Sequence, residues 1–382
     1  MTMTVHLFNP QNDLALADGS PNFTSPKAAV DLANAGACLP MWYGHPGDCF
    51  IGAVNAKWFK DISECFGLEV RPTMRVCDNA VPQPWGWSPQ VLKFLREFGF
   101  DDILMPDDKA VHRLRELSSR VAGADVITRL MHRVPEMTDV DPANYAPVIA
   151  YEPETAVQTI ERFGVAMMKL PWSNSGRGQQ VTDRTTPDEL MRRICGMIHR
   201  QGCVEIAPYY EKILDFAMLW DRGEFVGYSL FETDSHGGWT RNILLHDSHI
   251  EERILQALDR PVSLDRIKDA LQDLLFRDMD AETERLSPLV GVDFLIGRRP
   301  GTANMIIPVE INRRRTMGHV AHCLRQNFMS EDVNGTFRII PRTSMFNTAA
   351  DCVIEGRRLV RGSLDLVPPG GNFRFLLTAG SE

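Results

Sequence analysis

The most informative run of residues in this chain is Val309-Glu310-Ile311-Asn312-Arg313-Arg314. Its alternation of apolar and polar residues predicts a β-strand, in which side chains two positions apart point to the same face. Glu310 and Asn312 therefore share one face, while Ile311 points to the other, into a core. A carboxylate and an amide oxygen side by side provide hard oxygen donors, which suit Mg²⁺.

A second predicted strand, residues 291–295, carries Asp293 at its centre. If the two strands are antiparallel neighbours joined by residues 297–305, Asp293 approaches Glu310. Asp293, Glu310 and Asn312 could then hold one or two divalent ions against nucleotide phosphates, with Mg²⁺ expected and Mn²⁺ as an alternative. The competing interpretation is a solvated strand face.

A glycine-rich loop, Ser-Asn-Ser-Gly-Arg-Gly at 173–178, lies between predicted strands at 165–170 and 179–182. Glycine lets the backbone turn its N–H groups toward an anion, and serine hydroxyls add donors. The loop is neither a Walker A loop nor a Rossmann fingerprint, because no Gly-Lys-Ser/Thr follows and no helix begins there. Lys169, at the end of the preceding apolar strand, is placed to neutralise phosphate oxygens. The alternatives are a plain hairpin turn and a lysine that reaches solvent.

The rest of the chain alternates helices and strands. Residues 5–8 read as a strand that ends in a polar loop at 9–13, where ligands of open α/β sheets tend to lie. Capping and periodicity predict helices at 26–35, 88–98, 107–120, 153–163, 186–202 and 264–276. Apolar runs predict further strands at 103–106, 203–207, 214–220, 225–231, 290–296, 306–311, 351–354 and 373–377.

Taken in order, these features resemble the ATP-grasp superfamily over residues 107 to about 323. In that family a lysine at the start of the first nucleotide-domain helix contacts the ATP phosphates, and Lys109 matches it. Lys169 matches the second such lysine. The resemblance assigns the mobile phosphate loop to Ser173, Ser175, Gly176 and Gly178. It assigns the hinge that holds adenine and ribose to Glu205, Ile206, Ala207 and Pro208, and a nucleotide-pocket acid to Asp215.

The same resemblance makes Asp293, Glu310 and Asn312 the metal ligands. Arg314 matches the arginine of the family's Glu-x-Asn-x-Arg motif, which contacts the transferred phosphate or the acyl intermediate. Arg314 and Lys169 are therefore expected to be catalytic. Two departures stand out: Arg313 replaces the usual proline of the motif, and the hinge continues as Pro-Tyr-Tyr-Glu-Lys at 208–212 rather than a short glycine turn.

The fold implied is α/β with α+β lobes: an ATP-grasp fold behind an N-terminal open-sheet, Rossmann-like pre-ATP-grasp domain. The expected divisions are the N-terminal domain at 1–106, a linking helical part at 107–164 and a lid subdomain with the glycine loop at 165–222. A subdomain with the metal site follows at 223–345, and a strand-containing extension at 346–382.

The activity implied is that of an ATP- and Mg²⁺-dependent ligase. Such an enzyme activates a small-molecule carboxylate as an acyl phosphate and joins it to an amine, as with amino acids or peptides. Two other functions stay open: a small-molecule kinase that uses the same ATP site, and a nucleotide-binding module without catalysis. The substrates themselves are not encoded in any motif of the N-terminal loops.

Composition narrows the partners. The chain has 382 residues, 44% of them hydrophobic and 24% charged, and a formal net charge of −9, which argues against a nucleic-acid partner. No apolar run approaches the roughly 20 residues that span a bilayer, and no basic leader is present, so no membrane partner and a cytoplasmic location are expected. A homodimer is left open.

Two histidine pairs raise the question of zinc. His246 and His249, and His319 and His322 with Cys323, do not form a full ligand set at a familiar zinc spacing, and the eight cysteines form no CxxC pair. His319 and His322 could instead line the acceptor site just past Arg314.

Overall fold

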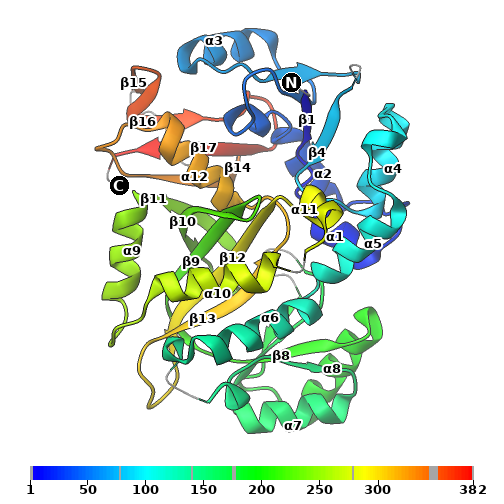
Figure 1. Cartoon of the computed structure of the whole chain (residues 1–382), viewed down its shortest axis with the longest axis vertical. Coiled ribbons are helices and arrows are strands. Elements are labelled where there is room, and N and C mark those ends of the chain that lie inside the picture. Colours follow the sequence, from blue (N-terminus) through cyan, green and yellow to red (C-terminus); the bar gives the residue numbers. More distant parts are fainter. Residues whose placement is uncertain are drawn as a thin grey trace.

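Within residues 3–76, 79–138, 141–173, 178–277, 279–343 and 352–380, which are the ones described, the computed structural model contains three β-sheets. A parallel sheet lies at one end of the molecule, a small antiparallel sheet at the other, and a nine-stranded sheet between them (Figure 1). This mixed α/β architecture confirms the predicted fold class.

The N-terminal sheet is parallel, which confirms the open α/β prediction for this part of the chain. Its strands in spatial order are β3 (Arg71–Thr73), β2 (Cys49–Ile51), β1 (Thr4–Leu7) and β4 (Val81–Pro84). The helices of this part are α1 (Asn12–Asp18), α2 (Lys27–Ala35), η1 (Leu39–Trp42), α3 (Ala56–Phe66), α4 (Pro89–Phe98) and η2 (Asp102–Leu104).

Two local expectations in this region were wrong. The strand predicted at 103–106 is replaced by η2, because the Asp101 carboxylate caps it by accepting a hydrogen bond from Ile103 N at 3.0 Å, and Ile103 is 84% exposed. The polar loop predicted at 9–13 is partly helical, since α1 begins at Asn12.

The small antiparallel sheet has the order β5 (Val148–Ala150), β8 (Val204–Pro208), β6 (Ala166–Lys169) and β7 (Gln179–Val181). Helices α7 (Pro153–Phe163) and α8 (Pro187–Gln201) pack on it around a core that includes Ile160, Met168 and Ile194. Thr186 caps α8 by accepting a hydrogen bond from Glu189 N at 3.4 Å, and the helix agrees with the one predicted at 186–202. We call this unit the lid sheet.

The central sheet is antiparallel throughout. Its strands in spatial order are β13 (Met305–Asn312), β12 (Leu289–Arg298), β9 (Glu211–Asp221), β10 (Glu224–Thr233), β11 (Trp239–Leu244), β14 (Gly335–Pro341), β17 (Phe373–Ala379), β16 (Arg358–Asp365) and β15 (Val353–Glu355). The other described helices are α5 (Asp108–Leu117), α6 (Arg120–Arg133), α9 (Asp247–Gln256), α10 (Leu264–Phe276), α11 (Ala281–Leu286) and α12 (Met317–Phe328), with short turns η3 (Pro135–Met137) and η4 (Pro142–Asn144).

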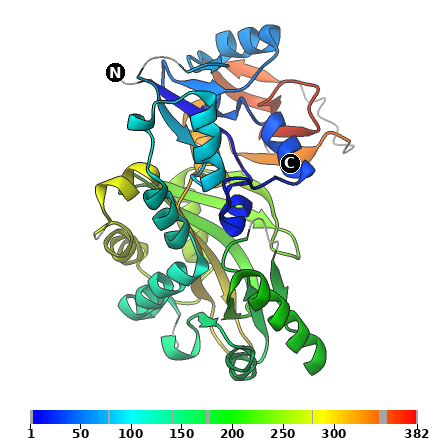
Figure 2. The same cartoon turned by 90° about the vertical axis from the view of Figure 1, so that its right-hand side faces the viewer.

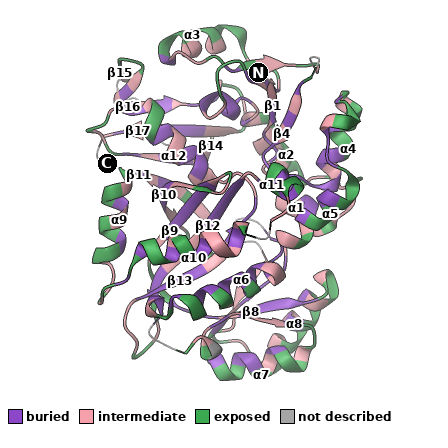
Figure 3. Ribbon diagram, in the orientation of Figure 1, coloured by how far each residue is buried: buried purple, intermediate pink, exposed green. Residues whose placement is uncertain are grey.

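The two faces of the central sheet differ, because side chains alternate along each strand. On β9, Phe216, Met218 and Trp220 pack into a core with α6, α9 and α10, whereas Asp215 and Ala217 point to the opposite, hollowed face. Figure 3 shows buried strands at the centre of the molecule, with exposed outer faces on α7, α8 and α9. The candidate site lies on the hollowed face.

The C-terminal strands tie the central sheet to the N-terminal domain. Trp42, Phe50, Phe337 and Phe375 share one core, and Trp42 Nε1 donates a hydrogen bond to Leu366 O at 2.8 Å. Both views place these strands beside the N-terminal sheet, at the end of the molecule away from α7 and α8 (Figure 1 and Figure 2). The domain boundaries given above remain predictions.

The helix predicted over 107–120 is two helices. α5 ends at Leu117 and α6 begins at Arg120, with Ser119 as its N-cap accepting a hydrogen bond from Ala122 N at 3.3 Å. Among the described helices, none has both the length and the apolar character needed to cross a membrane.

Candidate active site

The β12–β13 hairpin brings the predicted metal ligands together. Asp293 pairs directly across the antiparallel ladder with Glu310, and the Asn312 Nδ2 donates a hydrogen bond to Asp293 Oδ2 at 2.9 Å. The ladder shifts register just after Asp293. The pairing of strands 291–295 and 309–312 is therefore confirmed, and two acids and an amide lie on one wall of the hollowed face.

The charge on this wall is only partly balanced. Glu310 accepts a hydrogen bond from Arg120 Nη2 at 2.6 Å, whereas no ion pair to Asp293 is found in the described part of the chain. Burial, and then the like charge of Glu310, raises the pKa of Asp293 to about 8. A divalent cation would relieve both effects, so the donor set fits Mg²⁺.

No group of three or more His, Cys, Asp or Glu suited to a metal is found among the residues described. The candidate set contains two acids, and its third member is the Asn312 amide. This composition suits a hard ion shared with phosphate oxygens rather than a closed protein cage.

Lys169 lies at the end of β6, opposite Glu205 on β8. Its Nζ is 2.9 Å from Glu205 Oε1 and donates a hydrogen bond to Val309 O at 3.4 Å. Lys169 and Glu205 are 6% and 2% exposed, so the pair is desolvated. The lysine thus bridges the lid sheet to β13, next to Glu310, and its partner Glu205 was not foreseen from any local pattern.

A cation that the sequence analysis missed, Arg120, stands beside Glu310. As the first residue of α6, it donates hydrogen bonds to Leu170 O at 2.8 Å, Ser173 Oγ at 2.7 Å and Glu310 Oε1 at 2.6 Å. The available signal was the pair Ser118-Ser119, which marks a new helix start.

Lys109 does not join this group. It is exposed on α5 and lines neither of the two cavities that contain Glu310. The helix break after Leu117 is the physical reason: α6 directs its first residue toward Glu310, while α5 packs Val111 and Leu114 into the N-terminal core. A phosphate-binding role for Lys109 therefore has no support from its position.

Two large cavities meet at the acidic pair. One encloses about 1140 Å³ and the other about 1320 Å³, open solvent included, and Asp293 and Glu310 line both. The first, which we call the lid-side cavity, also contains Met167, Lys169, Ala207, Pro208, Tyr209, Tyr210, Lys212 and Asp215. The second, the N-terminal-side cavity, also contains Leu32, Trp85, Ser173, Ser229, Trp239, Asn242, Arg314, Met317, Ile339 and Phe373.

The residues predicted to form the hinge differ in their surroundings. Ala207 and Pro208 line the lid-side cavity, but Ile206 is fully buried in the core of the lid sheet and offers only its backbone. Asp215 Oδ2 accepts hydrogen bonds from Lys212 Nζ at 2.7 Å and Thr233 Oγ1 at 2.8 Å. Lys212 is a second cation in this cavity that the sequence analysis did not single out.

The glycine loop is described only at its two ends. Ser173 is buried beside Arg120, and Gly178 has a φ of +77° with its carbonyl accepting a hydrogen bond from Leu170 N at 3.0 Å. Left-handed backbone of this kind favours glycine. Ser175 and Gly176, predicted phosphate-binding residues, lie outside the described residues.

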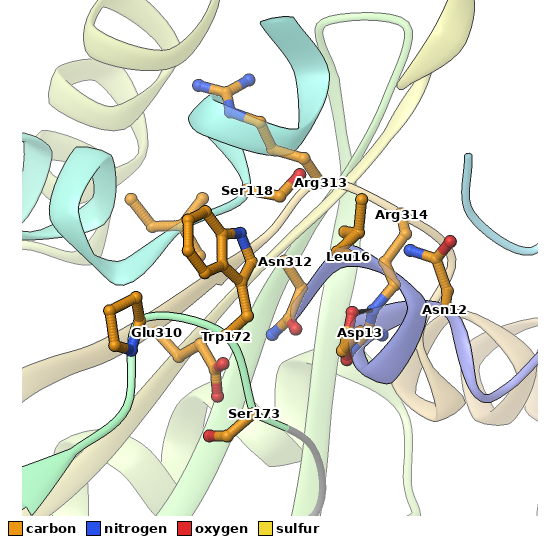
Figure 4. A pocket seen from close by; sticks show the side chains of 12 residues that line it. Asn12, Asp13, Leu16, Ser118, Trp172, Ser173, Glu310, Asn312, Arg313 and Arg314 are labelled. Atoms are coloured by element: carbon orange, nitrogen blue, oxygen red, sulfur yellow. Dashed lines mark hydrogen bonds and ion pairs between the residues drawn. The ribbon is translucent and has the colours of Figure 1, made fainter. Parts of the chain in front are cut away.

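Arg314 is held from the N-terminal domain. The Asp13 carboxylate accepts hydrogen bonds from Arg314 Nε at 2.8 Å and from Arg314 Nη2 at 2.5 Å. Burial lowers the pKa of the Arg314 guanidinium, but the charge of Asp13 outweighs this effect and raises the pKa. Figure 4 shows Asp13 and Arg314 facing each other, with Asn312 and Glu310 on the same wall. The predicted catalytic arginine thus lies at the junction of the two domains.

His319 and His322 do not line the acceptor side, so that expectation was wrong. His319 is a capping residue of α12: its Nδ1 accepts a hydrogen bond from Thr316 N at 3.2 Å, and burial lowers its pKa to about 3. His322 lies 3.8 Å from Asp247 in a separate pocket. The helix that begins right after the arginine motif turns both rings away from the cavities.

No protein-family model matches the sequence, and no curated protein matches it. Solved structures do match in fold. Biotin carboxylase from Campylobacter jejuni, in a beta-gamma-ATP complex, has a TM-score of 0.54 at 10% identity, over 98% of this chain and 87% of that one. Phosphoribosylamine–glycine ligase from Thermotoga maritima has a TM-score of 0.50 at 12% identity, over 100% and 93%. The chain has the ATP-grasp fold.

In this ATP-grasp fold the two halves of the site come from different sheets. The lid sheet contributes Lys169 and the hinge, and the central sheet contributes Asp293, Glu310 and Asn312. Arg120 and Asp13 connect that site to the linking helix and the N-terminal domain. Lys169 and Arg120 thus lie beside Asp293 and Glu310, at the place where the two cavities meet.

Proposed function

We propose that this protein is an ATP- and Mg²⁺-dependent ligase, which activates a small-molecule carboxylate as an acyl phosphate and joins it to an amine. The observation that carries the proposal is that Asp293 and Glu310 line two adjoining cavities at once. A phosphoryl group passed between a nucleotide and a second substrate needs such a shared wall.

The lid-side cavity suits the nucleotide. Its apolar parts, including Met167, Pro208 and Leu295, provide a surface for a planar base, while Lys169 and Lys212 offset phosphate charge. Backbone groups at the end of β8 and just beyond it, from Ala207 onward, can bind the edge of the base. The phosphates would then extend toward Glu310, where the two cavities meet.

Asp293, Glu310 and Asn312 would hold the Mg²⁺, and Mn²⁺ fits the same donors. The ion would offset the negative charge on the β- and γ-phosphate oxygens. The protein's own share of this task falls to Lys169 and Arg120, whose positive charges lie beside the same wall. Fixed charges of this kind stabilise a transition state without reorganising during the reaction.

In the chemical step, an oxygen of the substrate carboxylate attacks the γ-phosphorus, the bond to the β-phosphate oxygen breaks, and ADP leaves. The amine then attacks the carbonyl carbon, phosphate leaves with the bonding electrons, and the nitrogen loses a proton. Arg314 is placed to orient the carboxylate, because it lines the N-terminal-side cavity next to Asn312. Enclosing the site protects the acyl phosphate from water.

The N-terminal-side cavity indicates the type of substrate. Besides the acidic pair, its walls combine polar groups, among them Ser229, Asn242 and Arg314, with an apolar set, namely Leu32, Trp85, Phe231, Trp239, Met317, Ile339 and Phe373. An acidic or amino substrate with an apolar body fits this lining better than a sugar or a polyanion.

The test is ADP release by the full chain with Mg²⁺ and pairs of acids and amines, followed by product analysis. A ligase yields ADP, free phosphate and a new amide. A kinase yields ADP and a phosphorylated acceptor without stoichiometric free phosphate, and a binding module binds ATP without forming ADP. Glu310→Gln serves as the inactive reference, and either of the last two results would replace the ligase proposal.

A further inference from the structure

Arg313 is a buried arginine with no partner. It follows β13 on the same side as Ile311, which is the side opposite Glu310 and Asn312, and Figure 4 shows its side chain directed away from Asp13 and Asn312. Only 8% of Arg313 is exposed, and its Nη1 atom is shielded from solvent. Among the described residues, none accepts a hydrogen bond or forms an ion pair with its guanidinium.

The guanidinium keeps its charge in this setting. Burial alone lowers the pKa of Arg313 to about 10, which still leaves the group protonated at neutral pH. A buried charge without a partner is strongly unfavourable, so such groups are normally paired or replaced. The burial of this unpaired charge indicates a purpose other than packing.

The Arg313 side chain lines a cavity that shares no residue with the two large cavities of the candidate active site, although Arg313 also borders the pocket of Figure 4, which contains Glu310 and Asn312. This cavity, which we call the α6–α10 cavity, encloses about 830 Å³, open solvent included, between the helices behind β13. A Cβ added at Gly123 on α6 would meet nothing within 4 Å, so open space lies directly beside that helix. Its lining comes from α5, α6, α10 and α11 and from the end of β13, and it includes Gly123 and Arg313.

The charges of this lining leave one positive charge unbalanced. Arg113 pairs with Asp280 at 3.2 Å and Arg129 pairs with Asp125 at 3.2 Å, so each of these charges is matched at the rim. Arg313 remains. A monoanion restores neutrality around Arg313, whereas a multiply charged anion would leave excess negative charge in the cavity.

The remaining walls are apolar. Leu117, Val126, Leu274, Leu275 and Met279 surround the space that Arg313 enters. A ligand that fills it therefore needs a hydrocarbon body attached to its anionic group. A planar carboxylate matches the fork of a guanidinium with two parallel hydrogen bonds.

We propose that the α6–α10 cavity is a second binding site, for a small monocarboxylate with an aliphatic body, and that Arg313 binds the carboxylate. The site is independent of the proposed ligase activity. Its residue Arg313 lies between Asn312 and Arg314 in the chain, so a bound ligand acts on the same strand end that lines the active site, from the opposite face.

The test is calorimetric titration of the full chain with isovalerate, a branched monocarboxylate, against isovaleramide and inorganic phosphate. Wild-type protein is expected to bind isovalerate with a Kd of about 1 mM or tighter, and the other two probes at least about tenfold more weakly. Arg313→Met should weaken isovalerate at least about tenfold. Because Arg313→Met removes an uncompensated buried charge, it should also melt at a higher temperature than the wild type.

A second pair of variants locates the site without touching a charge. Gly123→Leu places a side chain in the open space and should weaken isovalerate by at least about tenfold. Gly196→Leu, at a helical glycine of α8 that also has nothing within 4 Å, is the matched control and should bind like the wild type. This pair decides the question if Arg313→Met fails to fold.

The active-site arginine separates this proposal from the ligase proposal. Arg314→Gln should retain isovalerate binding. The inference is overturned if the wild type does not bind isovalerate, if Arg313→Met or Gly123→Leu binds it as tightly as the wild type, or if binding depends on Arg314. The last result would place the carboxylate in the active site and would leave the ligase proposal standing.

Discussion

Asp13 and Arg314, 301 positions apart in the chain, form a two-pronged ion pair between the N-terminal domain and the central sheet. Their side chains are 14% and 17% exposed. Arg314 Nη1 donates a third hydrogen bond to Arg315 O at 3.1 Å. Of the five N–H groups of an arginine, two are thus left for a substrate. The orientation of Arg314 therefore depends on α1, a helix of the N-terminal domain.

Asp13→Asn is expected to lower turnover by about 10- to 100-fold while nucleotide affinity stays unchanged, because it loosens Arg314 without altering the lid-side cavity. Steady-state kinetics and equilibrium nucleotide binding measure the two effects. Asp18→Asn, at an exposed position of the same helix, is the matched control. Full turnover in Asp13→Asn would show that Arg314 needs no support from Asp13.

Lys169→Met should reduce turnover by roughly 30- to 1000-fold, because the positive charge next to the phosphates is lost. It also leaves Glu205 buried without its partner, so the single variant should be less stable than the wild type. The double variant Lys169→Met/Glu205→Gln removes both charges and should recover stability but not activity. Thermal melting and ADP release distinguish these effects. Recovery of activity in the double variant would contradict a phosphate-binding role for Lys169.

Glu310→Gln should raise the Mg²⁺ concentration needed for half-maximal nucleotide binding by about tenfold or more, because one carboxylate ligand becomes an amide. The measurement is nucleotide binding over a Mg²⁺ titration. Glu232→Gln is the control. Like Glu310, Glu232 lies on the central sheet and pairs with an arginine, Arg241, at 2.7 Å, but it lines neither cavity. Identical Mg²⁺ curves for both variants would remove Glu310 from the metal site.

Asp293 should make the stability of the metal-free protein depend on pH. Its folded-state pKa of about 8 lies above the ordinary value of 3.8, so between these values the native state binds more protons than the unfolded state. The free energy of unfolding then falls as pH rises through this window and levels off above pH 8. Asp293→Asn should flatten that profile and stabilise the protein at pH 7 by on the order of 1–3 kcal/mol.

Urea unfolding in the presence of a chelator, repeated from pH 5 to about pH 9, measures this profile. Added Mg²⁺ should stabilise the wild type more at pH 8 than at pH 6, because the ion competes with the proton on Asp293. A flat wild-type profile would mean that Asp293 titrates like an exposed carboxylate.

Local patterns predicted the parts of the site that lie on single elements. The alternation at 309–312 predicted the face shared by Glu310 and Asn312, and the connection 297–305 was short enough to predict pairing with Asp293. The apolar strand before the glycine loop predicted the place of Lys169. In each case the relevant spacing is within one strand or one hairpin, where side-chain direction follows from backbone geometry.

Residues that act across elements were missed or misplaced. Arg120 was taken for the end of a helix, yet it begins one and reaches Glu310, 190 positions away. Lys109 has the expected sequence context but lies exposed on α5. The partners of Lys169 and Arg314 were also not foreseen, because Glu205 and Asp13 come to them only through sheet pairing and domain packing.

The sequence by itself determined the ATP-grasp architecture of the described chain and the strand face that carries the acids, because periods of two and of 3.6 residues and capping signals act over short distances. The tertiary structure alone decided which cations meet those acids, which cavity each wall serves, and that Arg313 faces away from the site into a space of its own. Those outcomes depend on how helices and sheets from distant parts of the chain pack, and packing is set by the summed shape of many side chains rather than by any local pattern.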